Sequence, residues 1–233
     1  EDNFRENFAS SVQEVYEFFF NKIIISIAKK NFSKNLVFSG GCALNSSANR
    51  LITNFKDKFN KVFINYAPGD NGGALGAAFV IAAKSNFEIQ NSEDPYMGTR
   101  YNDIDVKNIL ESKYFKNKII YKHVINENEL LDTTTKYISE GNVIGWFQGK
   151  MEFGPRALGS RSIIADPRHQ KMQKNINLKI KFRESFRPFA PAVLKENQND
   201  WFDLKIDSPY MLIVGKILEK HRLKIKSSGF KVL

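Results

Sequence analysis

The chain has 233 residues, of which 42% are hydrophobic and 26% are charged, and its formal net charge is +10. This is enough apolar material for one large domain or two small ones, and no charged tail or Pro/Gly/Ser tract indicates disorder. No apolar run reaches the ~20 residues that a transmembrane helix needs, and the single cysteine, Cys42, excludes an internal disulfide framework. We expect a cytoplasmic protein without a membrane partner. Because Glu1 opens directly into helix-like sequence, we also expect it to be a piece of a longer protein.

The positive charge has two components with different distributions. The lysines spread along the whole chain, which is typical of a solvated surface, so we do not expect a nucleic-acid partner. Five of the nine arginines fall between residues 156 and 187, where even scattering would place about one. A guanidinium binds phosphate or carboxylate through two parallel hydrogen bonds. This window therefore predicts an anion site, with a set of surface salt bridges as the alternative.

The first ninety residues alternate helices with short strands. Apolar residues at helical spacing predict a helix over residues 8–30, and residues 35–41 are predicted to form a short buried strand that runs into glycines. A helix is predicted over 43–55, a second strand over 61–68, and a turn that opens into a small-residue helix over 69–84. This order favours a parallel or mixed α/β sheet. Both strands end in glycine-bearing turns that lead into helices, where ligands commonly bind.

The polar residues 85–100 predict a domain boundary, which divides the chain into domains of residues 1–92 and 93–233. The second domain is also predicted to be α/β. Its helices are predicted over residues 103–112, 126–141 and 168–180, and its strands over 118–125, 142–149, 162–167 and 210–218.

Both glycine turns of the first domain hold candidate ligand-binding groups. In "SGGCALN", Gly40 and Gly41 would let the backbone approach a phosphate or ribose closely, and Asn45 would bond a ligand or cap a turn. In "GDNGGALGAA", Asp70 would cap the following helix or hold a metal. Each glycine inside a helix costs up to about 1 kcal/mol relative to alanine. Close ligand approach or close helix packing should therefore compensate for the three glycines that follow Asp70.

The stretch "MEFGPRALGSRSIIADPR", residues 151–168, has unusual turn chemistry. Glycines bracket Arg156, and Pro155 fixes its own φ, so the loop would hold that guanidinium in one pose, as an anion site requires. Ser162 adds a hydroxyl, and Glu152 adds a carboxylate that would orient an arginine.

A fourth motif, "IKFRESFRPFAPAV", carries the remaining cations. Lys181 and Arg183 alternate with Phe182, so on an extended segment both cations would face one side. Arg187 precedes a proline, which favours extended backbone there. An exposed basic edge strand is the alternative interpretation.

In this order, "FSGGCALNSSANRLI", "APGDNGGALGAA", "MEFGPRALGSRSIIADPR" and "IKFRESFRPFAP" resemble the carbamoyltransferase family that includes nodulation and antibiotic-tailoring enzymes. The resemblance covers roughly residues 8–214. It implies an α/β fold in which the C-terminal part of an actin/hexokinase-like domain, residues 1–92, precedes a truncated YrdC-like domain, residues 93–233. It also implies that ATP and carbamoyl phosphate form a carbamoyl-adenylate in the YrdC-like domain. The carbamoyl group then passes to a hydroxyl of a small-molecule or glycan acceptor, beside a divalent metal, iron or magnesium.

The resemblance assigns roles to ten residues of this chain. The implied catalytic residues, which bind phosphates and neutralise charge as the adenylate forms, are Lys181, Arg183 and Arg156. The implied nucleotide-binding residues are Gly40, Gly41, Asn45, Arg161, Ser162 and Arg187, and the implied metal ligand is Asp70.

The chain also departs from the family pattern. We expect the family's metal-binding histidine pair to lie upstream of Glu1, because His123, His169 and His221 are isolated in the sequence. The family's closing His-Asp-Gly-Thr-Ala-Arg segment is missing. The alternative function is therefore a nucleotide-binding fragment or partner subunit without turnover, with a homodimer as a possible assembly. A third interpretation is an RNA-binding modification factor. Tight, salt-sensitive binding of tRNA would favour it, and weak salt dependence would count against it.

Overall fold

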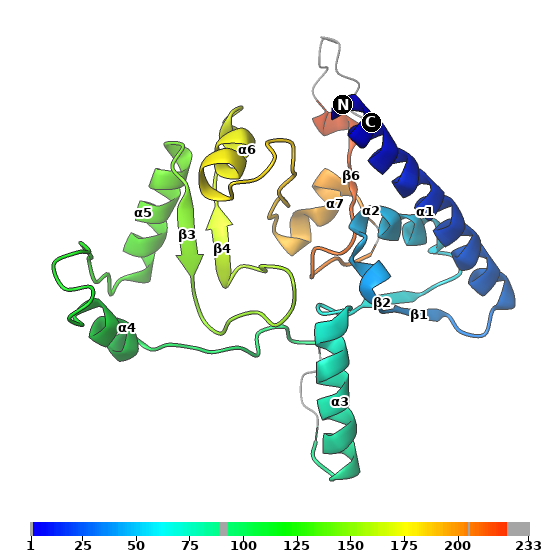
Figure 1. Cartoon of the computed structure of the whole chain (residues 1–233), viewed down its shortest axis with the longest axis horizontal. Helices are drawn as coiled ribbons and strands as arrows, with labels where there is room; N and C mark the ends of the chain where they lie inside the picture. The colour runs from blue at the N-terminus through cyan, green and yellow to red at the C-terminus, as the bar shows by residue number, and fades with distance from the viewer. Residues whose placement is uncertain (1, 89–92, 205, 223–233) are drawn as a thin grey trace. The chain divides into compact units, whose positions relative to one another are not determined.

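The computed structural model describes residues 2–88, 93–204 and 206–222 (Figure 1). Its backbone contacts divide the chain into two compact units, one of residues 1–77 and 192–233 and the other of residues 78–191. The residues after 191 therefore pack with the N-terminal residues in the first unit. The predicted domain boundary at residue 92 refers to the actin/hexokinase-like and YrdC-like domains that the resemblance implies. It stays a prediction.

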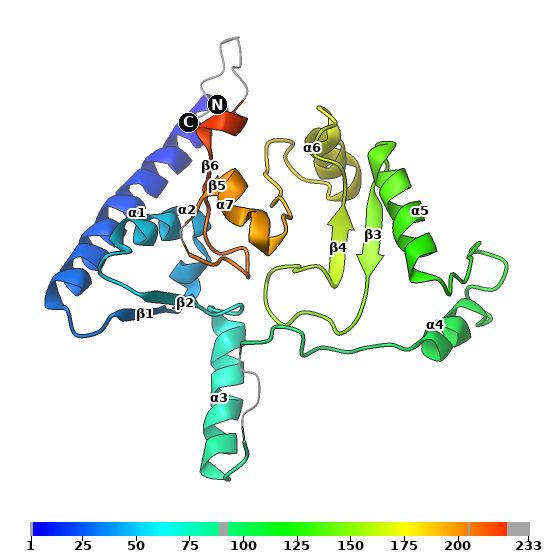
Figure 2. The same cartoon turned by 180° about the vertical axis from the view of Figure 1, so that it is seen from behind.

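A long helix, α1 (Asp2–Lys30), opens the first unit and confirms the predicted helix, with an extension toward the N-terminus. Its buried residues Phe20, Ile24 and Ala28 recur every four positions and therefore share one face. The helix ends in two lysines, which interact favourably with the negative end of the helix dipole. Figures 1 and 2 both place the short helix α2 (Ser46–Asn49) next to α1.

The two predicted strands of the first unit pair in parallel, as the helix–strand order indicates. They are β1 (Asn35–Phe38) and β2 (Lys61–Ile64). The burial predicted for the first strand is wrong, because Val37 of β1 is 70% exposed. In place of the single helix predicted between them, the structure has three short helical segments, η1 (Gly41–Leu44), α2 and η2 (Arg50–Phe55). The helical segments pack against α1 and the strands, and together they bury Phe20, Ile24, Ala28, Ala43, Ala48, Ile52, Phe59, Ile64 and Leu212.

Leu212 reaches this core from the late part of the chain. Around it lie η4 (Lys195–Asn197), α7 (Gln198–Trp201), β5 (Phe202–Asp203), β6 (Lys216–Ile217) and η5 (Glu219–His221), with β5 antiparallel to β6. The predicted strand over residues 210–218 is wrong except for its last part. Met211 has a φ of +56°, which interrupts the extended backbone. The next carbonyl, that of Leu212, accepts a hydrogen bond from the Nδ2 of the buried Asn49 at 2.8 Å and is therefore not available to a neighbouring strand.

The second unit begins with the end of α3 (Asp70–Lys84), which confirms a predicted helix. Two further predicted helices are confirmed as α4 (Asp103–Leu110) and α5 (Glu127–Ser139). Asn102 and Asn126 cap their N-termini by accepting a backbone N–H. Within the described parts of the chain, no helix is both long and apolar enough to cross a bilayer.

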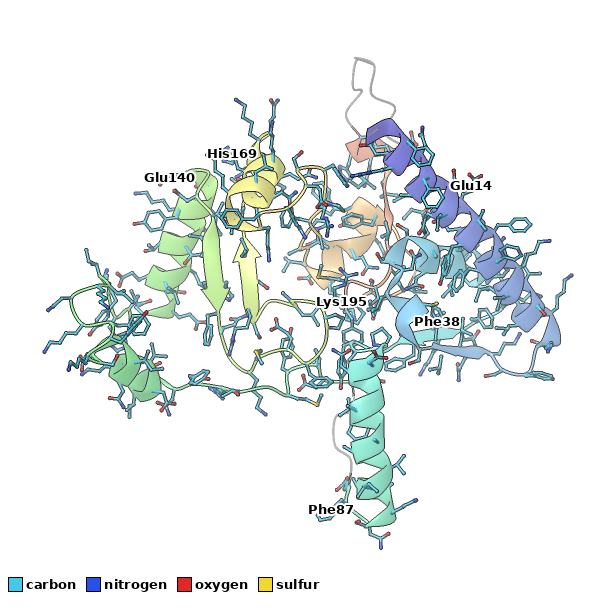
Figure 3. The ribbon with its side chains drawn as sticks, viewed as in Figure 1. Glu14, Phe38, Phe87, Glu140, His169 and Lys195 are labelled. Atoms are coloured by element: carbon cyan, nitrogen blue, oxygen red, sulfur yellow. The ribbon has the colours of Figure 1, made fainter. Side chains whose placement is uncertain are left out.

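An antiparallel pair, β3 (Ile144–Phe147) and β4 (Arg161–Ile164), confirms two predicted strands. Figures 1 and 2 both place α5 beside β3. At the end of α5, Gly141 has a φ of +87°, and a Cβ there would lie 3.3 Å from the ring of His169. Figure 3 shows His169 and Glu140 at this same end of the unit.

The predicted strand over residues 118–125 is wrong, because residues 119–126 form neither a strand nor a helix. Ile120 and Ile125 are exposed. A segment with strand propensity becomes a strand only when a neighbouring strand pairs with it, and among the described residues no strand pairs with this segment. The predicted helix 168–180 is shorter than expected. It consists of α6 (Met172–Asn175) and a π-type turn, η3 (Ile176–Ile180). The fold as a whole is a mixture of helices and small sheets, as the α/β prediction requires.

Candidate functional site

The two glycine turns of the first unit meet at the carboxyl ends of β1 and β2. The Gly40 N–H donates to the Pro68 carbonyl at 2.7 Å, and the Ser39 hydroxyl donates to the same oxygen at 3.2 Å. Gly40 has a φ of +96°, a conformation that favours glycine. A Cβ at Gly40 or Gly41 would meet nothing within 4 Å, so both glycines leave open space above the turn.

Asn45 has protein partners for both ends of its amide. Its Oδ1 accepts the Ala48 N–H at 3.1 Å, which caps α2. The same amide exchanges two hydrogen bonds with the Gln13 side chain, at 3.0 and 3.1 Å. The structure therefore contains the cap, one of the two roles predicted for Asn45, and its contact with a nucleotide stays a prediction.

Asp70 is exposed at the first residue of α3, where a carboxylate interacts favourably with the helix dipole. Within the described residues, no group of three or more His, Cys, Asp or Glu side chains is arranged to hold a metal ion. These residues alone therefore do not fit the implied metal, and Asp70 stays a predicted single ligand.

The glycines at the start of α3 have different causes. A Cβ at Gly72 would lie 1.9 Å from the Ala67 carbonyl oxygen, whereas a Cβ at Gly73 or Gly76 would meet nothing within 4 Å. Gly72 thus permits close packing of the backbone. Gly73 and Gly76 remain available for a close ligand.

A buried carboxylate, Glu152, holds the loop that contains Arg156. Its Oε1 accepts the backbone N–H groups of Leu158, Ser160 and Arg161 at 2.8, 2.7 and 3.3 Å. Burial raises the pKa of Glu152, but the bonds from these backbone N–H groups lower it by more, so the net pKa lies below its ordinary value. Glu152 therefore shapes the backbone, whereas the sequence prediction had it orient an arginine side chain.

A second restraint on this loop comes from residues 95–99, about fifty positions earlier. The Gly98 N–H donates to the Met151 carbonyl at 2.8 Å, and the Phe153 N–H donates to the Pro95 carbonyl at 2.7 Å. The Tyr96 hydroxyl donates to the Leu158 carbonyl at 2.7 Å. Burial, followed by the charge of Glu152, raises the pKa of Tyr96, which keeps its proton on the donor. Nothing in the local sequence signals this contact.

Arg161 is occupied by the protein itself. Its guanidinium donates to four backbone carbonyls, those of Gln148, Ser160, Thr99 and Gly149, at 2.8 to 3.2 Å. Its Cζ lies 3.4 Å from the centre of the Phe147 ring. This geometry fits the supporting role predicted for Arg161. Ser162 also supports the loop, because its hydroxyl accepts the Gly159 N–H at 3.0 Å.

Arg156 differs from Arg161, because no hydrogen bond or ion pair joins its side chain to the described residues. Its Nε is buried. A buried donor left unpaired costs about 1–3 kcal/mol. The flanking glycines, Gly154 and Gly159, have φ values of +126° and +109°, so the loop geometry depends on them. Arg156 is therefore the arginine that is best prepared for a ligand.

The remaining predicted cations lie after α6, and the prediction of an extended segment at residues 181–183 is wrong. Lys181 ends the π-type turn by donating its N–H to the Ile176 carbonyl at 2.9 Å. Phe182 has a φ of +49°, and the Arg183 N–H returns to the Asn177 carbonyl at 3.0 Å. A left-handed residue that closes a helix is a common terminating turn. Lys181 and Arg183 are consequently placed by a turn, with Lys181 exposed.

The side chains of Arg183 and Arg187 have local partners. The Arg183 Nε donates to the Asn177 Oδ1 at 2.7 Å, and its guanidinium lies 5.0 Å from the Phe189 ring centre. The Arg187 Nε lies 2.8 Å from a Glu184 carboxylate oxygen, and both side chains are about half exposed. A surface pair of this kind is worth little, so a ligand phosphate could replace Glu184.

The predicted phosphate-binding residues lie on two separate segments of the second unit, which we call two clusters. One contains Arg156, Arg161 and Ser162, and the other contains Lys181, Arg183 and Arg187. No hydrogen bond or ion pair joins the two clusters, whose residues all lie within the described range 93–204. Figure 1 shows the 148–160 connection beyond the lower end of the β3–β4 pair and α6 beyond its upper end. A single shared cradle stays a prediction.

Two surface hollows of about 480 and 550 Å³ lie in the first unit. They are lined by residues between 198 and 218 and between 25 and 58. None of the ten predicted site residues lines either hollow.

The fold and these clusters define an α/β protein with glycine turns at a parallel strand edge and an arginine loop suited to an anion. Comparison with known families narrows this class. The family model for the carbamoyltransferase N-terminus matches residues 1–79, and the model for the carbamoyltransferase C-terminus matches residues 135–229. The chain belongs to the carbamoyltransferase family.

Individual relatives agree with this assignment. An uncharacterised Synechocystis protein is 41% identical over an alignment that covers 93% of this chain and 36% of the relative. The nodulation protein NolNO of Sinorhizobium fredii is 32% identical, with coverage of 93% and 32%. The 3'-hydroxymethylcephem-O-carbamoyltransferase of Amycolatopsis lactamdurans is 32% identical, with coverage of 81% and 34%. The chain thus spans about a third of the length of these relatives.

Proposed function

We propose that the chain supplies the nucleotide- and phosphate-binding part of an O-carbamoyltransferase. In this proposal the first unit belongs to an actin/hexokinase-like domain, and the arginine clusters belong to a YrdC-like domain that forms a carbamoyl-adenylate from ATP and carbamoyl phosphate. The observation that carries the proposal is the buried Nε of Arg156, which has no hydrogen-bond partner among the described residues, in a loop whose backbone the Glu152 carboxylate holds. Membership of the carbamoyltransferase family supports carbamoyl transfer as the type of reaction.

The proposed reaction places specific demands on the site. Carbamoyl phosphate first reacts with water, which breaks its O–P bond and gives carbamate and phosphate. A carbamate oxygen then attacks the α-phosphorus of ATP, which forms the carbamoyl-adenylate and releases pyrophosphate. Negative charge accumulates on both leaving groups. Donors that are fixed before the reaction stabilise such charge, because they need no reorganisation. Arg156 belongs to the loop whose backbone Glu152 holds, and Lys181 and the outer nitrogens of Arg183 add positive charge in the second cluster.

The acceptor is proposed to be a hydroxyl of a small molecule or glycan. The name of the Amycolatopsis relative describes transfer to a hydroxymethyl group of a cephem, which is consistent with this class of acceptor. In the first unit, Gly40 and Gly41 would lie near the nucleotide or the acceptor, because they leave open space at the strand ends. No step is assigned to a metal.

The test is exchange of labelled pyrophosphate into ATP, measured on the full chain with and without carbamoyl phosphate. Exchange that requires carbamoyl phosphate is expected. Because a hydrogen bond to a charged group contributes about 1.5–3 kcal/mol, Arg156→Ala should reduce the exchange rate about 10- to 150-fold. The matched control is Arg5→Ala, which removes one exposed arginine from the other unit. Absence of exchange together with ATP binding would favour the alternative, a nucleotide-binding fragment or partner subunit. Absence of both would refute the proposal.

A further inference from the structure

The second cluster contains a fully buried amide, Asn177, whose hydrogen bonds go to the segment that carries two of the predicted phosphate ligands. The exposed fraction of Asn177 is 0%. Its Nδ2 donates to the carbonyls of Ser185 and Arg187 at 3.2 and 2.8 Å. Its Oδ1 accepts the Nε–H of Arg183 at 2.7 Å. The two ends of one side chain therefore bind the backbone and a catalytic candidate together.

These bonds determine which part of Arg183 is left for a ligand. A guanidinium has five N–H donors in one plane. Asn177 takes the Nε–H, and the Phe189 ring lies near the guanidinium. The four outer N–H donors have no hydrogen-bond or ion-pair partner among the described residues. The outer fork has the geometry that binds a phosphate through two parallel bonds, so the oxygen of Asn177 sets its direction.

A neighbouring amide allows backbone support to be separated from arginine orientation. Gln173 lies four residues before Asn177 on the same helical segment, and its Nε2 donates to the carbonyls of Phe186 and Arg187 at 3.1 and 3.0 Å. Gln173 therefore holds the same backbone but makes no bond to the Arg183 side chain. Gln173 is exposed, so water can replace its bonds, whereas loss of the buried Asn177 amide leaves two carbonyls without donors. The size of the two effects can therefore differ for this reason alone, and arginine orientation is identified by whether each effect depends on Arg183.

We propose that Asn177 is a positioning residue for phosphate recognition, which acts by fixing the outer fork of Arg183. This inference rests on the proposed function, because it assumes that the second cluster binds the phosphates of a nucleotide. An amide suits this position because it has both an acceptor and donors. Its oxygen accepts the Arg183 Nε–H, and its NH₂ group donates to two backbone carbonyls. A buried leucine of similar size would satisfy neither side.

The experiment measures the affinity of the full chain for ATP and for adenosine by calorimetry. Arg183→Ala is expected to weaken ATP binding about tenfold or more, as loss of a bond to a charged group does. Asn177→Leu should weaken it nearly as much. Asn177→Asp keeps an oxygen for the Arg183 Nε–H but loses both donors to the backbone carbonyls, so it should recover part of the loss. Adenosine affinity should not change, because adenosine has no phosphate. In the Arg183→Ala background, Asn177→Leu should add less than about twofold, since residues that act through one contact are not additive.

Gln173→Leu is the matched control, and its effect on ATP affinity should be the same with and without Arg183. Because Asn177→Leu leaves two carbonyls without donors, circular dichroism checks its fold. The unmodified chain gives a further measurement: the Nε–H signal of Arg183 in a nuclear magnetic resonance spectrum should exchange slowly with solvent. Fast exchange of this proton would overturn the proposal whatever the variants do.

The outcomes separate this inference from the function on which it rests. If the unmodified chain does not bind ATP, the proposed function fails and the inference fails with it. If Arg183→Ala weakens ATP binding but Asn177→Leu does not, the function stands and only the positioning role is wrong. Additive losses from Asn177→Leu and Arg183→Ala would also overturn the positioning role.

Discussion

Replacing Glu152 by glutamine should loosen the loop that carries Arg156 without changing its shape. The glutamine oxygen can still accept the N–H groups of Leu158 and Ser160, which lie 2.8 and 2.7 Å from the present carboxylate. The charge is lost, however, and a hydrogen bond to a charged group is worth about 1 kcal/mol more than a neutral one. For two good bonds, local opening should become easier by about 2 kcal/mol, which corresponds to about a 30-fold change. The third bond, from Arg161 at 3.3 Å, is too long to add much.

Amide hydrogen exchange at Leu158 and Ser160, followed by nuclear magnetic resonance, measures this opening directly. Exchange in Glu152→Gln should be about 30-fold faster than in the unmodified chain. The control, Glu140→Gln, removes an exposed carboxylate at the end of α5 (Figure 3) and should leave both rates unchanged. Equal protection of the two amides in both variants would refute the reasoning.

The same loop should respond to acid, with a sign set by the pKa of Glu152. That pKa is lowered in the folded chain from an ordinary 4.5. A lowered carboxyl pKa gives stability that is complete above pH 4.5 and is lost as the pH falls through the lower folded value. Protection of Leu158 and Ser160 should therefore decrease with acid below pH 4.5 in the unmodified chain. It should change far less in Glu152→Gln, where no carboxylate titrates at this position.

The remaining predictions concern packing and a second acid-sensitive pair. Gly72→Ala should lower the free energy of unfolding by about 1–3 kcal/mol, because its Cβ would lie 1.9 Å from the Ala67 carbonyl oxygen. Gly73→Ala, into open space, should be neutral or raise that free energy by up to about 1 kcal/mol; equal effects in urea titrations of the two variants would contradict the packing argument. The side-chain hydrogen bond from Arg168 lowers the pKa of Asp166 from 3.8 to about 2. Stability from this pair should be complete above pH 3.8 and decline toward pH 2, which melting temperatures of the unmodified chain and Asp166→Asn would test.

The parts of the fold that local chemistry determines were predictable from sequence. The helix over residues 126–141 is an example, because Asn126 provides an N-cap and Gly141 takes the positive φ that ends it. The strand predicted over 118–125 failed for the opposite reason. Its residues have strand propensity, but a strand forms only where another strand pairs with it, and a local window contains no information about that partner.

The candidate site shows the same division. The glycine turns and the arginine-rich loop were visible in the sequence, because glycine with positive φ and clustered guanidinium groups leave local patterns. The contacts that hold these groups were not visible. Tyr96 reaches Leu158 across 62 positions, and Asn177 is one of several polar residues in a segment that the sequence predicts as an ordinary helix. Such contacts depend on which segments the fold brings together, so they require coordinates.

The support of the Arg156 loop by Glu152 has a consequence for how this family could diversify. The carboxylate bonds only to main-chain N–H groups, which every residue except proline possesses. Side chains between the fixed glycines can therefore be exchanged while the loop keeps its course. The course of the loop backbone therefore does not depend on the side chains that would contact an anion. A single substitution in the loop can change which anion is preferred while the surrounding structure stays the same.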